Sequence, residues 1–323
     1  MNRFFRHIAL LSLTLVGASG PALAQAGYPD RPIRVILGFA PGGVADGAAR
    51  IAAQILSESL GQPANVENRA GAGGSIAATT VARSAPDGYT LLVHATSDII
   101  NPILNKDLGY SLTKDFAPLG MITNSPNVLV VHPSLPVNSV AEFVAYARTR
   151  PVSYGSAGVN TVSHLSGALL SAASGAPMLH VPYKGTGAAQ MDLLSGRLSF
   201  MFDGASTSLT NAQMGKVKAL AVTSPQRWPS APSLPTVAES GYPGYSLLAI
   251  FGLMAPAGTP EPVLARIAGA LQRGLQTPAV REQIEKLGAQ PGTLTREAYG
   301  AFLREETARW SKLAADGVLR KED

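Results

Sequence analysis

Five glycine-rich segments lie between a short apolar run and an amphipathic run, at places where main-chain amides could bind an anion. They are residues 38–46, 71–75, 154–161, 183–187 and 202–206. In parallel α/β sheets, ligands bind beyond the carboxyl ends of the strands, where helix N-termini converge. Unpaired N–H groups and the positive end of a helix favour carboxylates and phosphates there. One such segment is weak evidence, but five in one chain predict an anion site built largely from main chain.

The first segment carries the most distinctive residue types. Pro41, Gly42 and Gly43 let the backbone turn sharply and approach a ligand without hindrance from a Cβ atom. Phe39 could stack on the ligand or shield it from water. Asp46 could cap the following helix or tie down the loop, and a plain tight turn capped by Asp46 is the competing interpretation.

Residues 154–161 add hydroxyl groups to the main-chain donors, because Ser156 and Thr161 belong to a strand-to-helix turn. His164 follows within the expected helix, where a lone histidine is more often packed or exposed than part of a site. The second segment does not complete a dinucleotide-binding G-x-G-x-x-G motif, because Ile76 occupies the place of the last glycine.

The sequence lacks the common motifs of catalysis. Ser156 does not stand in a G-x-S-x-G motif, because Tyr154 occupies the first glycine position. Gly215 and Lys216 are followed by valine and not by the serine or threonine of a P-loop. The histidines are scattered, and zero cysteines exclude thiolate metal sites, disulfides and a cysteine nucleophile. We therefore expect no enzyme, metal or cofactor, although spacing alone leaves a folded pair of carboxylates open.

The N-terminal residues 1–24 have the pattern of a cleaved secretory signal peptide. Arg3 and Arg6 precede an apolar run over 8–16 that is too short to span a bilayer, and a small-x-small cleavage site ends at Ala24. A second candidate site ends two residues further on, and an uncleaved anchor helix is the alternative. Without a cysteine for lipidation, the exported chain should be free in the periplasm.

The composition fits a globular and mildly basic protein. With 323 residues, of which 46% are hydrophobic, the chain can bury more than one core, which predicts two lobes. Loss of Arg3 and Arg6 with the signal lowers the formal net charge from +5 to +3. No lysine- or arginine-rich run occurs, so we expect no nucleic acid partner. No later apolar run is long enough to span a membrane.

Short apolar runs alternate with amphipathic runs, which predicts parallel sheets of the doubly wound type. The expected strands cover 33–37, 65–68, 90–94, 128–131 and 152–154. The expected helices cover 45–60, 75–83, 140–149 and 161–174.

Two long, extended apolar stretches, 119–131 and 247–255, would carry the chain between the lobes. Two crossings place both ends of the chain in one lobe and its middle in the other. We expect lobe 1 to comprise 25–125 and 251–323, and lobe 2 to comprise 126–250. Helices from residue 260 onward would cap lobe 1.

Short motifs along nearly the whole mature chain carry a family resemblance. In chain order they are YPDRPIR at 28–34, FxPGGxxD at 39–46, NRxGAGG at 68–74, APDGYT at 85–90, YGSAG at 154–158, HL at 164–165, VPYKG at 181–185, PTVAE at 235–239 and APAGTP at 255–260. As a set, they resemble the Bug-type proteins, which are the extracytoplasmic solute-binding receptors of tripartite tricarboxylate transporters.

The resemblance implies a type II periplasmic-binding-protein fold, in which two α/β lobes close over a small carboxylate. Family ligands include citrate-like acids, dicarboxylates, acidic amino acids and aromatic or nicotinate-like acids, held largely by backbone amides and bridging waters. Carried over to this chain, the ligand contacts are Phe39, Pro41, Gly42, Gly43, Asp46, Gly73, Ser156, Ala157, Gly158, Thr161 and Asp203. Val44 and Ala45 depart from the family's usual polar or small residues, which bears on ligand preference.

The residues and the resemblance together predict a monomeric periplasmic receptor that captures a small mono-, di- or tricarboxylate and delivers it to membrane transporter subunits. Two alternatives stay open. A sensory receptor would pass its liganded state to a membrane kinase, and an exported hydrolase would turn the acid over. The identity of the acid does not follow from the sequence, because sites built from main chain leave little trace in residue types.

Overall fold

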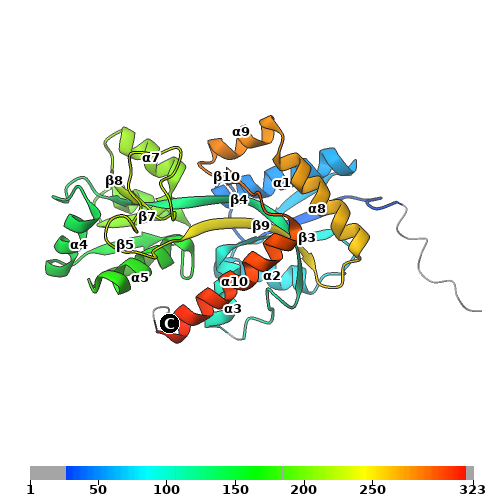
Figure 1. Ribbon diagram of the computed structural model, residues 1–323, viewed down its shortest axis with the longest axis horizontal. Coiled ribbons are helices and arrows are strands. Elements are labelled where there is room, and N and C mark those ends of the chain that lie inside the picture. The colour runs from blue at the N-terminus through cyan, green and yellow to red at the C-terminus, as the bar shows by residue number, and fades with distance from the viewer. Residues whose placement is uncertain (1–26, 106, 184, 318–323) are drawn as a thin grey trace, which may run out of the picture.

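The structure is a computed structural model, and it describes residues 27–105, 107–183 and 185–317 (Figure 1). The expected signal peptide, residues 1–24, lies outside the described residues. The strands are β1 (Ile33–Leu37), β2 (Ala64–Asn68), β3 (Thr90–Ala95), β4 (Phe116–Val131), β5 (Ser153–Ser156), β6 (Leu179–Pro182), β7 (Phe200–Gly204), β8 (Lys218–Val222), β9 (Leu248–Pro256) and β10 (Gln290–Pro291). The helices are α1 (Val44–Leu60), the 3₁₀ turn η1 (Ala72–Gly74), α2 (Ser75–Ala82), α3 (Thr96–Leu104), α4 (Val140–Thr149), α5 (Val162–Ser174), α6 (Thr186–Leu194), α7 (Ala205–Gln213), α8 (Glu261–Leu275), α9 (Pro278–Lys286) and α10 (Arg296–Ala315).

One sheet path runs through the molecule in the order β2-β1-β3-β9-β4-β7-β5-β6. Figure 1 shows β4 and β9 crossing side by side between two groups of helices. We call β1–β3 with α1–α3 and α8–α10 lobe 1, and β5–β8 with α4–α7 lobe 2. Strand β4 pairs with β9 as far as Pro126 and with β7 and β8 from Asn127 onward. The two predicted crossing stretches are therefore strands that link the lobes.

The directions of the strands determine which ends of the two parallel sets lie at the boundary between the lobes. Strands β1, β2 and β3 are parallel, and β3 and β4 are each antiparallel to β9. All of them therefore run with β4 toward lobe 2. Strands β5, β6 and β7 are parallel to one another and antiparallel to β4, so they run toward lobe 1. The carboxyl ends of both parallel sets consequently face the boundary between the lobes.

Each lobe buries apolar residues on both faces of its strands. Alternation along β1 places Val35 and Leu37 in the cluster covered by α1 and α8, and Ile36 in the cluster covered by α2, α3 and α10. In lobe 2, Phe143 and Phe200 meet at 4.7 Å between ring centroids within a third cluster. The C-terminal helices pack against the strands and helices of lobe 1, with Trp310 of α10 fully buried.

The prediction of parallel sheets is correct for the outer strands and wrong for the centre. Strands β3, β9, β4 and β7 are successive antiparallel neighbours. A strand that is buried on both faces reads as a continuous apolar run whichever way it points, so the pattern of β4 and β9 did not reveal direction. The predicted helix 140–149 is confirmed in full, whereas β8, β10 and α3 were not anticipated.

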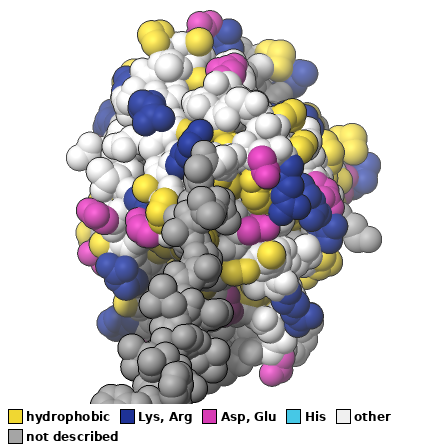
Figure 2. Space-filling model, turned by 90° about the vertical axis from the view of Figure 1, so that its right-hand side faces the viewer, with side chains coloured by type: hydrophobic (Ala, Val, Ile, Leu, Met, Phe, Trp, Pro, Cys, Tyr) yellow, Lys and Arg dark blue, Asp and Glu magenta, His cyan; other side chains and the backbone are white. Residues whose placement is uncertain are grey.

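Within the described residues, no helix is both long and apolar enough to cross a membrane. Figure 2 shows the outer end of lobe 1, where basic and acidic side chains are interspersed over the part that the grey residues leave visible. The visible part of that face shows no broad basic surface.

Candidate functional site

The five glycine-rich segments all follow the carboxyl end of a parallel strand, and these ends face one another across the lobe boundary. Segments 38–46 and 71–75 follow β1 and β2 in lobe 1, and the other three follow β5, β6 and β7 in lobe 2. We call this boundary the interlobe edge. Helices α1, α2, α6 and α7 begin within these segments and α5 directly after its own, so their N-termini also converge there.

Asp46, in the first turn of α1, holds segment 38–46 in place through hydrogen bonds. Its carboxylate accepts hydrogen bonds from Arg50 Nε at 2.8 Å, Asn68 Nδ2 at 3.0 Å and Gly42 N at 3.2 Å. Burial raises the pKa of Asp46, but these hydrogen bonds outweigh burial and hold the pKa below its ordinary value. Gly43, not Asp46, is the N-cap residue. Of the two roles considered for Asp46, the structure shows the loop anchor.

The anchored loop presents its turn to solvent. Pro41, Gly42 and Gly43 are exposed, and Gly42 has a φ of 94°, a conformation that favours glycine. Phe39 is half-buried and packs against the lobe 1 core, while Asn68 Nδ2 also donates to the Phe39 carbonyl at 2.9 Å. Phe39 therefore has a structural contact as well as a position near the edge.

Gly73 lies in the second segment, which Asn101 of α3 holds in place. Asn101 Nδ2 lies 3.2 Å from the Gly73 carbonyl, 3.4 Å from the Ala72 carbonyl and 3.1 Å from Ser75 Oγ. Gly73 itself has a φ of 60°. Asn101 was not among the predicted site residues, because a single asparagine within a helix carries no local signal.

The lobe 2 loop that follows β5 is held together by its own hydrogen bonds. Ser156 Oγ accepts from Gly158 N at 3.1 Å, and Thr161 Oγ1 donates to the Gly158 carbonyl at 2.6 Å. Ala157 N donates to Ser163 Oγ at 3.0 Å. The structure thus brings Ser156, Ala157, Gly158 and Thr161 into one turn, with the Gly158 amide donating to Ser156 and the Ala157 amide donating to Ser163 of α5.

Two histidines form hydrogen bonds with residues of this loop. His164 is 4% exposed, and its ring lies 4.0 Å from the ring of His180 in a stacked arrangement. His180 Nε2 lies 2.7 Å from Ser156 Oγ, and His164 Nδ1 accepts the Asn160 amide hydrogen at 3.0 Å. His164 is therefore a packed histidine that also orients the loop. His180 was missed because only the pairing of β5 with β6 brings it to Ser156.

Asp203, the second-last residue of β7, is a buried carboxylate that is 4% exposed. Gln190 Nε2 donates to its Oδ2 at 2.7 Å. Burial raises the pKa of Asp203 to about 6, although the hydrogen bonds from the Gly204 main chain and from Gln190 act in the opposite direction. A Cβ atom placed on Gly204 would lie 4.0 Å from Val44 Cγ2, so this strand end faces the start of α1.

Side chains from the two lobes meet directly at the interlobe edge. Asn160 Nδ2 of lobe 2 donates to Asn101 Oδ1 of lobe 1 at 3.1 Å. Among the described side-chain atoms at this edge, Ser97 Oγ, Asp98 Oδ1 and Asn160 Oδ1 are buried without a hydrogen-bond partner. Buried polar atoms are normally paired, so these three mark a place suited to a polar ligand or water.

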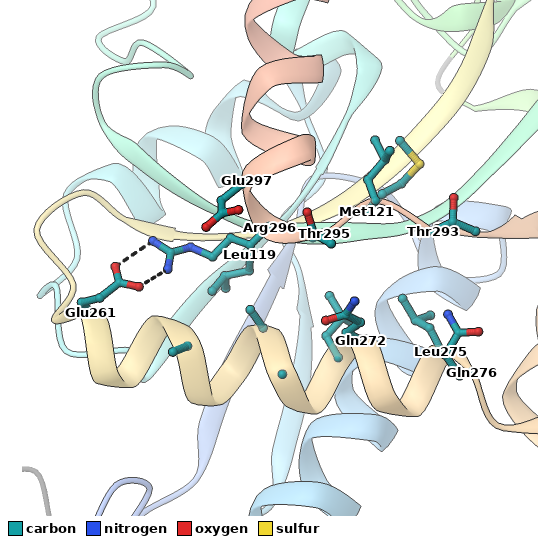
Figure 3. A pocket seen from close by; sticks show the side chains of 17 residues that line it. Leu119, Met121, Glu261, Gln272, Leu275, Gln276, Thr293, Thr295, Arg296 and Glu297 are labelled. Atoms are coloured by element: carbon teal, nitrogen blue, oxygen red, sulfur yellow. Dashed lines mark hydrogen bonds and ion pairs between the residues drawn. The ribbon is translucent and has the colours of Figure 1, made fainter.

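A cavity of about 340 Å³ lies elsewhere, on lobe 1 between α8, β4 and residues 292–297 (Figure 3). Its lining includes Leu119, Met121 and Leu275, and the ion pair of Arg296 with Glu261 closes one end. None of the eleven predicted contact residues lines it. Among the described residues, no group of three or more His, Asp or Glu side chains is placed to hold a metal ion.

Two α/β lobes, joined by crossing strands and facing each other with their strand ends, define a binding protein of the periplasmic type. A family model described as the tripartite tricarboxylate transporter family receptor matches residues 48–317. The chain therefore belongs to this receptor family, TctC or Bug, as its motifs indicated. Membership also confirms the prediction of a transporter-associated binding protein and not an enzyme.

Individual relatives agree with this assignment. Protein BugT of Bordetella pertussis is 35% identical over 99% of this chain and 98% of its own length. The solved structure of R. palustris Rpa4515 with adipate has a TM-score of 0.83 and 35% identity, covering 89% of this chain and 97% of that one. MatC from Rhodopseudomonas palustris with bound malate has a TM-score of 0.81 and 34% identity, covering 88% and 99%. Both ligands named for these structures are carboxylates.

Proposed function

We propose that this receptor binds a small dicarboxylate at the interlobe edge and delivers it to the membrane subunits of a tripartite transporter. The facing carboxyl ends of the two parallel strand sets carry this proposal, because they direct main-chain donors of both lobes to one place. The adipate and malate named for the two related structures support a dicarboxylate.

The helix N-termini at the edge support an anionic ligand. The N-cap residues of α1, α5 and α7 are Gly43, Thr161 and Gly204, and none of them makes a side-chain cap hydrogen bond. Away from the edge, Ser139 and Thr295 do cap α4 and α10 in that way, whereas α8 and α9 also lack a side-chain cap. Uncapped first turns leave N–H groups for another acceptor, which a carboxylate supplies.

We place one carboxylate of the ligand against the Pro41–Gly42–Gly43 turn and the start of α1, and the other against the lobe 2 loop and the start of α5. Phe39 then borders the apolar body of the ligand, while Asp46, Ser156 and Thr161 hold the loops in position. Gly73 and Asp203 border the site from the neighbouring segments. Closure bends the crossing strands β4 and β9, near the change of partner at Pro126.

Thermal unfolding in the presence of adipate, malate, succinate, citrate and nicotinate tests this function. An acid present at 100 times its Kd stabilises the protein by about 2.7 kcal/mol, because it binds only the folded state. Maltose and spermidine serve as uncharged and cationic controls. Stabilisation by a control compound but by none of the acids would overturn the carboxylate assignment.

We further propose that residues 1–24 are removed during export and that the receptor acts as a monomer in the periplasm. The periplasmic character of the related binding proteins supports this location. N-terminal sequencing of the exported protein should begin at Gln25 or Gly27. An intact Met1 on membrane-bound protein would instead show an anchor.

A further inference from the structure

We propose that Asn101 and Asn160 form a latch that holds the lobes closed and positions the glycine segment 71–75. The proposal rests on the binding function proposed above and names two positioning residues for it. The latch is the hydrogen bond from Asn160 Nδ2 in lobe 2 to Asn101 Oδ1 in lobe 1, at 3.1 Å.

Asn101 joins three segments that are distant in sequence. It belongs to α3, its Nδ2 lies within hydrogen-bond distance of Gly73 O and Ser75 Oγ, and its Oδ1 accepts from lobe 2. Its side chain is 5% exposed, so loss of any of these bonds leaves a polar group without water to replace it. Asn101 therefore couples the shape of the 71–75 segment to the position of lobe 2.

The surrounding acceptors fix the orientation of both amides. The Ala72 carbonyl, the Gly73 carbonyl and Ser75 Oγ surround one end of the Asn101 side chain, and that end must therefore be the NH₂ group. Its oxygen then faces lobe 2 and can only accept. Asn160 must consequently present its NH₂ group to Asn101.

The lobe 2 partner is held in a conformation that few residue types adopt. Asn160 has a φ of 61°, in the left-handed region that asparagine tolerates better than most residues. His164 Nδ1 accepts its main-chain N–H at 3.0 Å, which fixes the residue at the start of α5. A Cβ atom placed on Gly73 would lie 3.5 Å from the Val159 carbonyl, so the two loops also approach each other beside the latch.

In this proposal the described arrangement, in which Asn160 and Asn101 bond across the lobes, is the closed one. When the lobes separate, Asn101 Oδ1 and Asn160 Nδ2 exchange their mutual bond for bonds to water. A single hydrogen bond of this kind changes an equilibrium by about threefold to tenfold. Loss of the latch should therefore raise the rate of ligand dissociation by that factor and leave association unchanged.

Asn160→Gly is the sharpest variant, because glycine adopts the positive φ without strain and removes only the side chain. Asn138→Gly, an exposed asparagine before α4, is the matched control. The chain has no cysteine, so Ser59→Cys on α1 and Ala145→Cys on α4, both exposed, can carry a fluorescent pair that reports lobe separation.

Single-molecule distance measurement without ligand should show a smaller closed fraction for Asn160→Gly than for Asn138→Gly. Stopped-flow release of adipate should be about threefold to tenfold faster. In a double-mutant cycle, Asn160→Gly should add nothing to the release rate of Asn101→Ala, because either change removes the same bond.

Equal closed fractions and equal release rates for Asn160→Gly and Asn138→Gly would overturn the latch, as would additive effects in the cycle. If neither adipate nor another acid binds, the proposed ligand class fails, while the ligand-free distances still decide whether the latch exists. A closed fraction that falls in Asn160→Gly supports the latch in either case.

Discussion

Gly38 and Gly74 touch through their main chains, and this contact joins the two glycine-rich segments of lobe 1. A Cβ atom placed on Gly38 would lie 2.4 Å from Gly74 Cα, closer than any side chain allows. The first segment can therefore reach its observed position only with glycine at residue 38.

Gly38→Ala should lower the free energy of unfolding by about 1–3 kcal/mol, because the added methyl group forces the two segments apart. The same displacement should weaken carboxylate binding. Urea unfolding measures the first effect and titration with adipate the second. Gly187→Ala in α6, where nothing lies within 4 Å of the added atom, is the control and should be neutral or slightly stabilising. A Gly38→Ala protein as stable as the control would show that the contact does not constrain the loop.

Asp46→Ala should destabilise the protein by about 1–3 kcal/mol at neutral pH, because three donors lose their common acceptor. The pKa of Asp46 is lower in the folded protein than its ordinary value of 3.8. Its stabilising contribution is thus present above about pH 4 and disappears as the pH falls through the folded pKa. Unfolding of wild type and variant at pH 7 and pH 3 should give a difference that shrinks at the lower pH.

Glu282→Ala provides a matched control for Asp46→Ala, since it breaks an exposed ion pair with Lys286. Its effect on the free energy of unfolding should be small, as is usual for exposed pairs. Equal destabilisation by the two substitutions would argue against Asp46 as the anchor of the loop.

The free energy of unfolding of Asp203→Asn should increase relative to that of wild type as the pH rises from 4 to 7. The pKa of Asp203 is raised to about 6 in the folded protein, so the folded state holds its proton more tightly than the unfolded state does. Protonated Asp203 contributes fully to the free energy of unfolding of the wild type below about pH 4. This contribution, at most about 3 kcal/mol, is lost by about pH 6. Denaturant unfolding at pH 4, 5, 6 and 7 measures the difference. A difference that does not change with pH would contradict a buried, protonatable Asp203.

Local patterns predicted those parts of the fold that local physics determines. The apolar run 33–37 and the amphipathic run 140–149 became β1 and α4 with the expected bounds. The direction of β9 relative to β4 depends on pairing across more than a hundred residues, which no local pattern encodes.

The residues of the candidate site likewise include some that local patterns predict and others that only folding brings together. Glycine-rich turns predicted Gly42 and Gly73 as candidate contacts, and both have the positive φ that restricts residue type. Asn101 and His180 escaped notice because their roles come from partners that only the folded chain brings near.

A crystal structure of this receptor with the dicarboxylate that stabilises it most tests the central claim directly. We expect one carboxylate within hydrogen-bond distance of the amides at the start of α1 and the other at the start of α5, between closed lobes that keep the bond from Asn160 to Asn101. An acid bound in the lobe 1 cavity beside Arg296, with the interlobe edge free of it, would contradict the account.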